Sequence, residues 1–254
     1  MSSKILVVIP SFLPHKMCFS LLGSLQDSSV ERVALFDNGG SFPESKIQNL
    51  NKVEIIRSGC NLNWLASNNL GAMLAINGGF DYVCFMNDDV HLSDKFFYGL
   101  LSTYSSATRA GIVVPMYNGG FCRPASDRHS SPDNWKPKPK AIEVKYTDGT
   151  CMFMSTKVFK DVGLFDPSFR FPNWGADVDL CYRARQKGYK CYVSGQAMLW
   201  HHQKAGGATA KTYYGNAVRW LKTGSRQAIA DLTEKYGKDF KSVLSLADNA
   251  YNMK

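Results

Sequence analysis

Short apolar segments alternate with helix-like segments over about the first 116 residues of the chain. Five apolar segments are rich in Val, Ile and aromatic residues and are bounded by turn residues, which is typical of strands. They cover Ile5–Pro10, Val33–Phe36, Val53–Arg57, Tyr82–Met86 and Ile112–Pro115. This alternation predicts an α/β fold with a parallel sheet and a ligand-binding edge at the carboxyl ends of its strands.

A helix is expected between the third and fourth strands, with one apolar face. The stripe that defines this face consists of Leu62, Leu65, Asn69, Leu70, Met73 and Leu74. Residues at this spacing lie on one side of a helix, so the stripe is expected to pack on the sheet. Gly78-Gly79 is expected to end the helix.

The pattern changes between Tyr117 and Lys140, where Gly, Pro, Ser and basic residues form a long loop. Such a loop inside a domain is usually a functional lid or disordered. We interpret the chain as one domain with a nucleotide-binding half (1–116), a half that binds the metal and the acceptor (117–202), and a C-terminal loop with helices (203–254). After the long loop we expect a pair of strands, two helices, two further strands and three helices. Their ranges are Ile142–Tyr146 and Gly149–Ser155; Thr156–Val162 and Ala176–Gln186; Lys190–Val193 and Ala197–Trp200; Tyr213–Leu221, Arg226–Tyr236 and Phe240–Ala250.

Composition narrows the range of partners. The 254 residues are 44% hydrophobic, which is enough for a full core, and the formal net charge is +9. A positive excess favours an anionic partner. The basic residues are spread out, without a run of five like charges, so the pattern favours a small anionic substrate or a peripheral membrane contact and argues against nucleic acid.

The seven cysteines point to a reducing compartment. They are odd in number, widely spaced and without a C-x-x-C pair, and several lie in apolar segments where a free thiol behaves as a small hydrophobic group. Pro10 interrupts the first apolar run too early for a signal-peptide core, and no apolar stretch approaches membrane-spanning length. We therefore expect a cytoplasmic protein.

Two adjacent carboxylates follow the fourth apolar segment, in Asn87-Asp88-Asp89. Because the carboxyl end of a buried strand faces the ligand crevice of an α/β sheet, this position suits a divalent cation. The alternative is a plain turn, since Asn and Asp favour strand ends. A second acidic cluster, Asp177 and Asp179, followed by His201 and His202 after another apolar segment, favours the cation site.

Seven motifs occur in a fixed order along residues 4–202. They are Val7-Val8-Ile9-Pro10-Ser11, Phe36-Asp37-Asn38-Gly39-Gly40-Ser41, Asn61 to Gly71, Asn87-Asp88-Asp89, Gly163-Leu164-Phe165-Asp166-Pro167, Asp177 to Arg183, and Trp200-His201. The ordered set resembles the inverting family 2 glycosyltransferases of GT-A fold, closest to the rhamnosyl- and galactofuranosyltransferases that build bacterial or viral polysaccharides. The resemblance implies a mixed, mainly parallel central sheet flanked by helices, with C-terminal helices.

The resemblance also implies a metal-dependent donor site. Asp89 is the candidate metal ligand, while Asp88 faces the ribose or shares the metal. Oxygen ligands suit Mg²⁺ or Mn²⁺, and an imidazole from His201 favours Mn²⁺. The alternative for His201 is a strand-end histidine with one hydrogen bond, and for His202 this alternative is preferred.

Further residues are candidates for the nucleotide-sugar pocket. Asp37 follows a predicted strand and is expected to accept a hydrogen bond from a base N–H or a ribose hydroxyl. A turn with the following glycines explains an aspartate at this position almost as well. Pro10 and Ser11 are expected to shape the pocket wall. Asn69 and Arg57 are weaker candidates, because a helix-packing amide and a solvated strand-end charge are the respective alternatives.

Asp177 is the candidate general base. Inversion by direct displacement needs a group that takes the proton of the acceptor hydroxyl, and in the family an Asp at a helix start does this. Helix capping by Asp177 is the alternative, and Asp179 is expected to have such a structural role. The family usually has Glu before the base, where this chain has Ala176. Trp174 either stacks on a sugar or fills the space between the two halves.

The sequence thus predicts an enzyme that transfers a hexose or deoxyhexose from a nucleoside diphosphate to a hydroxyl of a glycan or glycolipid. The segment Gln203 to Thr209 is expected to close over the diphosphate, with Lys204 or Lys211 adding charge; a plain linker is the alternative. Two other functions remain open. One is a sugar nucleotidyltransferase, and the other is a nucleotide-sugar-binding module without turnover, for which Ala176 is the motivation.

Overall fold

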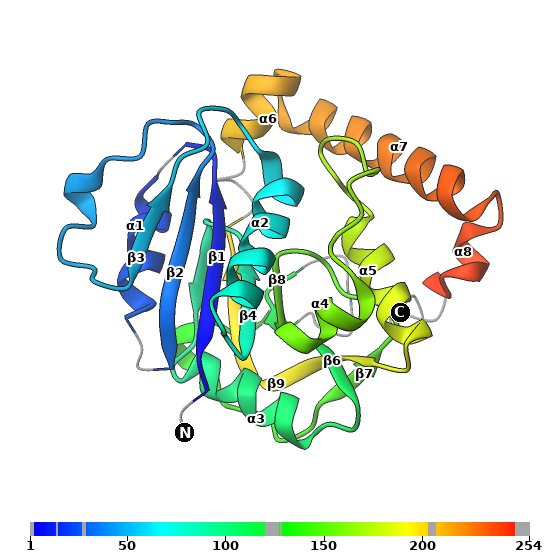
Figure 1. Cartoon of the computed structure of the whole chain (residues 1–254), viewed down its shortest axis with the longest axis horizontal. Helices are drawn as coiled ribbons and strands as arrows, with labels where there is room; N and C mark the ends of the chain where they lie inside the picture. Colours follow the sequence, from blue (N-terminus) through cyan, green and yellow to red (C-terminus); the bar gives the residue numbers. More distant parts are fainter. Residues whose placement is uncertain are drawn as a thin grey trace.

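The apolar segments form the strands of one central sheet in the computed structural model, and helices cover both faces (Figure 1). The structure describes residues 3–13, 15–26, 29–119, 127, 129–202 and 207–246. The strands are β1 (Ile5–Ser11), β2 (Val30–Asp37), β3 (Val53–Ile56), β4 (Tyr82–Met86), β5 (Val90–Leu92), β6 (Ala110–Tyr117), β7 (Ile142–Val144), β8 (Cys151–Ser155) and β9 (Lys190–His201). The helices are α1 (Lys16–Ser24), α2 (Asn63–Asn77), α3 (Phe96–Ser106), α4 (Thr156–Val162), α5 (Ala176–Gln186), α6 (Gly207–Tyr214), α7 (Ala217–Tyr236) and α8 (Phe240–Val243), with 3₁₀ turns at Glu44–Lys46 and Pro132–Asn134.

The sheet is mixed, as expected. Within the described residues its strand order is β3-β2-β1-β4-β8-β6-β9-β5, and β7 pairs with β9. The strands β3, β2, β1 and β4 are parallel. β8 runs antiparallel between β4 and β6, whereas β9 is parallel to β6. The carboxyl ends of β1, β2 and β4 therefore share one edge with the beginning of β8.

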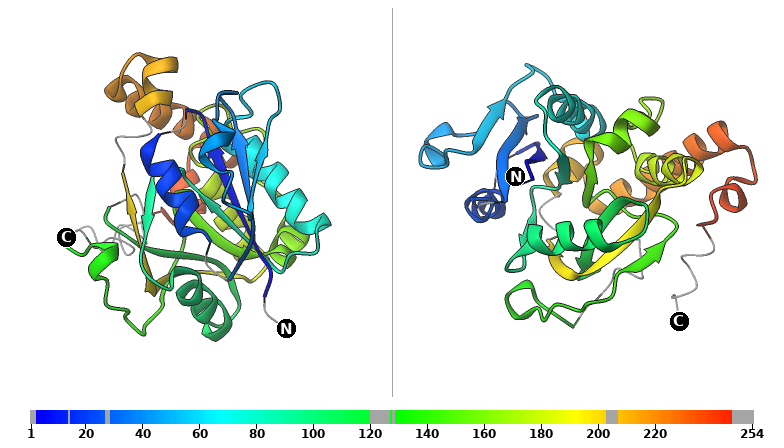
Figure 2. Two further views of the ribbon diagram at one scale, coloured as in Figure 1. Left: turned by 90° about the vertical axis from the view of Figure 1, so that its left-hand side faces the viewer. Right: turned by 60° about the horizontal axis from the view of Figure 1, so that its bottom comes forward.

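Helices form a layer on each side of the sheet (Figure 2). α2, α4 and α5 pack together on one face, and α1 and α3 lie on the other. α6 and α7 run along the top of the molecule in Figure 1, and α8 follows at its right-hand end. The placement of the C-terminal helices matters for the site because α7 packs beside the loop that precedes α5.

Most predicted elements form within a few residues of the expected bounds, and α4, α5 and β4 match them. Several expectations were wrong. The helix expected at 240–250 ends at Val243. The segments at 142–146 and 149–155 do not pair with each other, because β7 pairs with β9 and β8 with β4 and β6. The two strands expected at 190–193 and 197–200 are one strand, β9. The helix expected at 213–221 is broken at Gly215, where φ is +78°, and Asn216 caps α7 by accepting from the Arg219 N–H at 2.9 Å.

The buried face of α2 also differs from the prediction. Leu70, Met73 and Leu74 are 40–46% exposed, and the helix instead packs on the sheet through small residues, mainly Gly71, Ala72 and Ala75. A Cβ atom on Gly71 would lie 2.5 Å from the Val8 methyl groups. The small residues allow the helix axis to approach β1 closely, so the larger apolar side chains cannot occupy that face. Helical spacing identified the helix and not the face it buries.

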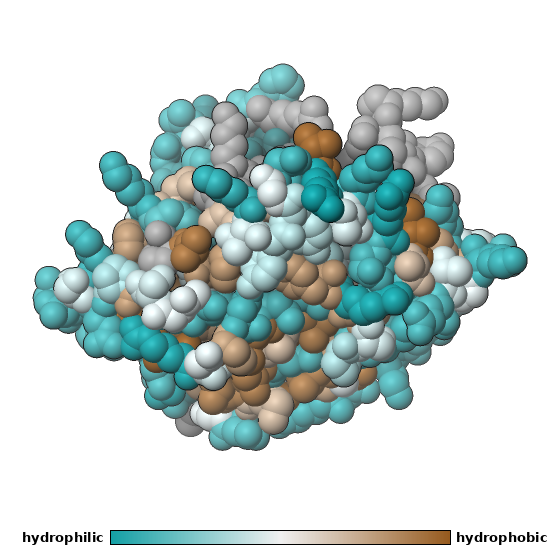
Figure 3. Space-filling model, turned by 90° about the horizontal axis from the view of Figure 1, so that it is seen from above, coloured by the Kyte–Doolittle hydropathy of each residue, from teal (hydrophilic) through white to brown (hydrophobic). Residues whose placement is uncertain are grey.

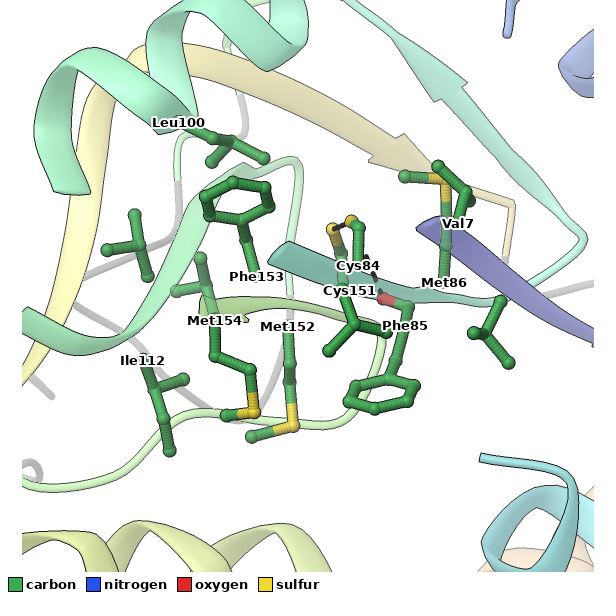
Figure 4. Close-up of a cluster of buried hydrophobic side chains, with 14 of the residues drawn as sticks. Val7, Cys84, Phe85, Met86, Leu100, Ile112, Cys151, Met152, Phe153 and Met154 are labelled. Atoms are coloured by element: carbon green, nitrogen blue, oxygen red, sulfur yellow. Dashed lines mark hydrogen bonds between the residues drawn. The ribbon is translucent and has the colours of Figure 1, made fainter. Parts of the chain in front are cut away.

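The core lies between the sheet and its helices. Figure 4 shows its centre, where Phe85 and Met86 of β4 meet Met152 and Phe153 of β8 among other apolar side chains. The Sγ atoms of Cys84 and Cys151 are 3.7 Å apart in this cluster, where the two thiols form a hydrogen bond and no disulfide. All cysteines in the described part of the chain are free thiols, and most of them are buried.

We expect Gly71→Ala to lower the free energy of unfolding by about 1–2 kcal/mol, because the β-branched Val8 side chain has little freedom to yield. Gly23→Ala is the matched control, since a Cβ there meets nothing within 4 Å in α1. The control should be neutral or stabilising by up to about 1 kcal/mol through helix propensity. Urea denaturation of both variants measures the difference. Equal stability of the two variants would contradict the close packing of α2 on β1.

Candidate active site

The carboxyl ends of β1 and β4 are joined through Asp88. The Ser11 hydroxyl donates to Asp88 Oδ2 at 2.7 Å, and His15 Nε2 lies 3.4 Å from Asp88 Oδ1. The hydrogen bond to Asp88 raises the pKa of His15 above its ordinary value. Neither His15 nor its proximity to Asp88 was predicted. These contacts fix one carboxylate of the acid motif between two loops at the predicted edge.

Asp89 and His201 form the centre of the candidate metal site. β5 follows Asp89 directly, and its pairing with β9 sets Val90 opposite His201. As a result, His201 Nε2 lies 3.0 Å from Asp89 Oδ1. Burial lowers the pKa of the imidazole, but the hydrogen bond and charge of Asp89 outweigh it and raise the pKa of His201. The adjacent His202 uses its backbone N–H to donate to the Asp89 carbonyl at 2.9 Å, in line with the structural role expected for it.

One oxygen of the Asp89 carboxylate is free to bind a further group. Its side chain is only 4% exposed, and Oδ2 is buried without a hydrogen-bond partner among the described residues. Across that part of the chain, no group of three or more His, Cys, Asp or Glu side chains gathers to hold a metal ion. The pair of Asp89 and His201 therefore fits a cation whose other ligands come from a bound phosphate group, as is common for hard divalent ions.

Asp37 and Arg57 lie together at the end of β2, where they hold a loop. Asp37 is buried and accepts from the N–H groups of Ser41 at 3.2 Å and Phe42 at 2.9 Å. Arg57 Nε donates to Asp37 at 3.2 Å, and its Nη1 donates to Glu44 at 2.6 Å. These partners give Arg57 the role of a loop anchor. A contact from Asp37 to a nucleotide would be made in addition to these bonds.

The loop after β2 also approaches the loop after β1. A Cβ atom on Gly39 would lie 1.8 Å from the Phe12 carbonyl oxygen, so only glycine permits the contact. Pro10 stands opposite Phe36 in the β1–β2 pairing, and Ser11 stands opposite Asp37. The structure thus brings Pro10, Ser11 and Asp37 to the same edge as the acid motif.

Asn69 and Trp174 have protein partners. Both ends of the Asn69 amide bind the backbone of Phe165, with Nδ2 donating to its carbonyl at 2.8 Å and Oδ1 accepting from its N–H at 2.9 Å. Trp174 packs so closely on Gly224 of α7 that a Cβ there would lie 2.8 Å from its ring. It also meets Trp220 edge to face, with centroids 5.6 Å apart. These contacts correspond to the structural alternatives for both residues.

Asp177 lies in the first turn of α5, as expected, with a half-buried side chain. Burial and the negative charge of Asp148 raise the pKa of Asp177 to about 6, although backbone N–H groups of Val178, Gly149 and Asp177 itself oppose the shift. Gly175 occupies the N-cap position and makes no side-chain cap bond. Asp148 was missed from the sequence; an Asp-Gly turn directly before a strand was the signal that pointed to it.

Unlike Asp177, Asp179 forms ion pairs with cationic side chains. It is fully buried and lies 2.5 Å from Lys235 Nζ and 2.8 Å from Arg183 Nε. The Tyr236 hydroxyl donates to its Oδ1 at 2.5 Å. Asp179 therefore ties α5 to α7, which is a structural role of a different kind from the expected helix capping.

The segment expected to close over the diphosphate is described only from Gly207 onward, so Lys204 lies outside the described residues. Lys211 is exposed on α6. Tyr213 of this helix reaches the edge of the site, where its hydroxyl accepts from Asn61 Nδ2 at 2.8 Å and its ring lies 5.4 Å from that of Phe12. α6 thus covers the loop after β1.

Comparison with known proteins adds to this geometry. No family model matches the chain. Uncharacterised proteins of Mycobacterium bovis and of two strains of Mycobacterium tuberculosis are each 29% identical over 212 residues, which cover 83% of this chain and 77% of theirs. The crystal structure of GalNAc-T7 with UDP, GalNAc and Mn²⁺ superposes with a TM-score of 0.57 at 14% identity. The chain has the GT-A fold. The match covers 78% of this chain, which spans only 43% of the GalNAc-T7 chain.

The GT-A fold confirms the predicted fold class. It also indicates which edge of the sheet to consider as a ligand site. In open α/β sheets, ligands bind outside the carboxyl ends of the strands. In this GT-A chain, that edge carries Ser11, Asp37, Asp88 and Asp89. No helix in the described part combines the length and apolar character needed to span a membrane.

We expect Asp179→Asn to lower the free energy of unfolding by about 2–4 kcal/mol, because it leaves Arg183 without its counter-charge and Lys235 with Asp166 alone. The loss is smaller than for a fully buried pair, since Lys235 and Arg183 remain 25% and 23% exposed. Glu54→Gln is the control, because its pair with Arg32 is more than half exposed and contributes at most about 0.5 kcal/mol. Urea denaturation compares the two. A similar loss in both variants would argue against the bracing role of Asp179.

Proposed function

We propose that the protein is an inverting, metal-dependent glycosyltransferase. It moves a hexose or deoxyhexose from a nucleoside-diphosphate sugar to a hydroxyl of a glycan or glycolipid. The observation that carries the proposal is the buried pair of Asp89 and His201 at the carboxyl edge of a GT-A sheet, in which one carboxylate oxygen has no hydrogen-bond partner among the described residues. The GT-A fold and a structural neighbour described with UDP, GalNAc and Mn²⁺ support it.

The donor half of the site consists of residues after β1, β2 and β4. Asp89 and His201 would hold Mn²⁺ or Mg²⁺, with Mn²⁺ favoured by the imidazole. A divalent cation bound there supplies positive charge against the diphosphate leaving group. The hydrogen bond from the Ser11 hydroxyl orients the Asp88 carboxylate. Asp88 would accept a hydrogen bond from a ribose hydroxyl or share the metal. Pro10 and Asp37 complete the nucleotide wall.

Asp177 acts on the acceptor side. Its carboxylate takes the proton of the acceptor hydroxyl while that oxygen forms a bond to the anomeric carbon. The bond from this carbon to the diphosphate oxygen breaks on the opposite face, and its electron pair leaves with the diphosphate. The configuration at the carbon is thereby inverted. A pKa of about 6 leaves Asp177 largely deprotonated at neutral pH while making it a stronger base than an ordinary aspartate.

The finer assignment to family 2, with rhamnosyl- or galactofuranosyltransferase-like specificity and a role in polysaccharide synthesis, rests on the order of sequence motifs. A cytoplasmic location belongs to the same proposal. The expected peripheral membrane contact suits α7, which exposes Val218, Leu221 and Ile229 beside basic residues such as Arg219 and Lys222. Figure 3 views the molecule from the side on which α6 and α7 lie, where apolar residues stand among polar ones.

Asp177→Asn should reduce transfer by at least about 10³-fold, because it removes the proton acceptor while keeping the side-chain shape. Donor binding should be unchanged. A thermal-shift screen of nucleotide sugars with Mn²⁺ first identifies the donor. Product formation then measures transfer, and calorimetry measures donor binding. Full transfer by the variant would refute the base assignment. Donor binding by the wild type without transfer or hydrolysis favours the binding module, whereas release of pyrophosphate from a nucleoside triphosphate and a sugar phosphate favours the nucleotidyltransferase.

Asp89→Ala should abolish the Mn²⁺-dependent part of donor affinity, since the buried carboxylate is the main anionic ligand offered to the cation. Calorimetric titration of the donor with and without Mn²⁺ tests this expectation. Asp94→Ala is the matched control, because Asp94 is an exposed carboxylate five residues further along. Equal Mn²⁺-dependent affinity in Asp89→Ala and the wild type would contradict the assignment.

A further inference from the structure

The outward side of α7 carries a row of large apolar side chains, on the side of the molecule viewed in Figure 3. Val218, Leu221 and Ile229 are 74%, 56% and 52% exposed. Their spacing places them on one side of the helix. The opposite side faces the protein, where Gly224 packs against Trp174. The apolar row therefore stands in water on a helix whose inner side is already occupied.

A basic row runs beside the apolar row. Arg219, Lys222 and Arg226 are exposed and follow one another at helical spacing, each next in the chain to the apolar row or bordering it. Lys211 is exposed on the preceding helix, α6. Between residues 207 and 230 these four cations are accompanied by no Asp or Glu. The two rows together form what we call the outer face of α7, which is apolar along one row and positively charged along the other.

This combination fits the surface of an anionic bilayer. A helix that lies in a membrane interface buries its apolar row at the level of the acyl chains, while its basic residues contact anionic headgroups. Long basic side chains beside such a row can extend their charged ends to the phosphates. A second copy of the chain fits this face less well, because the basic rows would meet in a symmetric dimer and each chain carries a net charge of +9.

The same helix lies against the acceptor side of the proposed site. On its inner side, the buried Asp231 carboxylate lies 2.5 Å from the guanidinium of Arg170, in the loop that leads to Asp177. At the preceding helix, the Tyr213 hydroxyl accepts from Asn61 Nδ2 at 2.8 Å. A helix with its side chains is about 10–12 Å across. The thickness of α7 is therefore all that separates its outer face from the loop before α5.

We propose that the outer face of α7 docks the protein on an anionic phospholipid bilayer, and that the acceptor is a glycolipid of that bilayer. The choice of a glycolipid rests on the proposed function, which leaves a glycan and a glycolipid open. A sugar anchored by a lipid tail has to extend only past one helix to reach the loop before α5. The docking itself requires no catalysis.

Sedimentation of the full-length protein with vesicles tests the docking. Vesicles of phosphatidylcholine with phosphatidylglycerol should bind the protein at least about tenfold more tightly than vesicles of phosphatidylcholine alone. The difference should fall with added salt, since exposed charges are screened. Equal binding to both kinds of vesicle, or binding to neither, would overturn the docking surface.

Paired substitutions test whether the outer face of α7 is the surface that binds. Leu221→Ser with Ile229→Ser interrupts the apolar row, and Arg219→Gln with Lys222→Gln reduces the basic row. Each pair should weaken binding to the mixed vesicles at least about tenfold. Circular dichroism should show an unchanged fold, because all four side chains are exposed. Tyr98→Ser is the matched control, since it removes a 68% exposed aromatic side chain from α3, at the opposite end of the molecule in Figure 1.

The control should bind the vesicles as the wild type does. An equal loss in Tyr98→Ser and in the paired variants would overturn the assignment to α7. So would a dimer that forms without vesicles and dissociates in Leu221→Ser with Ile229→Ser, because a second copy would then cover this face.

Transfer assays test the acceptor. Methyl glycosides of a panel of sugars are each compared with the dodecyl glycoside of the same sugar in the mixed vesicles. The value of kcat/KM should be at least about tenfold higher for the dodecyl form, because docking concentrates enzyme and acceptor on one surface. Leu221→Ser with Ile229→Ser should remove this advantage and leave transfer to the methyl glycoside unchanged.

Equal kcat/KM for the two forms in the wild type would overturn the glycolipid acceptor. If Asp177→Asn transfers sugar as well as the wild type, the proposed function fails. Vesicle binding still reports on the docking surface in that case, so the two failures are distinguishable.

Discussion

The antiparallel pairing of β8 with β4 is the constraint on which the site depends. Met86 at the end of β4 stands opposite Cys151 at the start of β8. The residues that follow β4 are therefore neighbours of the residues that precede β8, which puts the acid motif beside the turn at 147–150. A strand parallel to β4 at the same place would begin at the opposite edge of the sheet. The insertion of one reversed strand thus brings the acid motif and the turn at 147–150 together.

The C-terminal helices complete this arrangement from the other side. The loop before α5 is held to α7 by Arg170, whose guanidinium lies 2.5 Å from the buried Asp231 carboxylate. Lys235 binds both Asp166 and Asp179, and Trp174 packs on Gly224. The start of α5 is therefore fixed by contacts with a helix some fifty residues later in the sequence. Changes in α7 would reach Asp177 through this loop without any contact between α7 and a substrate.

Local signals in the sequence predicted much of the fold. Apolar segments gave β1 and β4, and helical spacing with turn residues gave α4 and α5, because each element is stabilised largely by its own pattern. The ends of these elements also predicted which carboxylates lie at the ligand edge. Asp88, Asp89 and His201 do meet there, although the choice of His201 came from the family resemblance.

Features that depend on partners distant in the sequence could not be predicted in this way. Nothing in the segment around Cys151 specifies that it pairs antiparallel with β4, and the small-residue face of α2 is understandable only once Val8 is seen beneath Gly71. The same holds for Asn69, whose amide is a plausible ligand in isolation but binds the Phe165 backbone. Side chains at a crevice are recognisable from the sequence, whereas the partners that already occupy them are not.

The contrast between Asp177 and Asp179 shows how one helix turn supports two roles. The two carboxylates are two residues apart and so point in different directions from α5. Asp179 meets Lys235, Arg183 and the Tyr236 hydroxyl, which stabilise its charge and leave it inert. Burial and the negative charge of Asp148 raise the pKa of Asp177, against the opposing effect of backbone N–H groups. Because cations and a hydroxyl already engage Asp179 while no cation pairs with Asp177 among the described residues, the contacts of the two carboxylates are the stronger reason to propose Asp177 as the base.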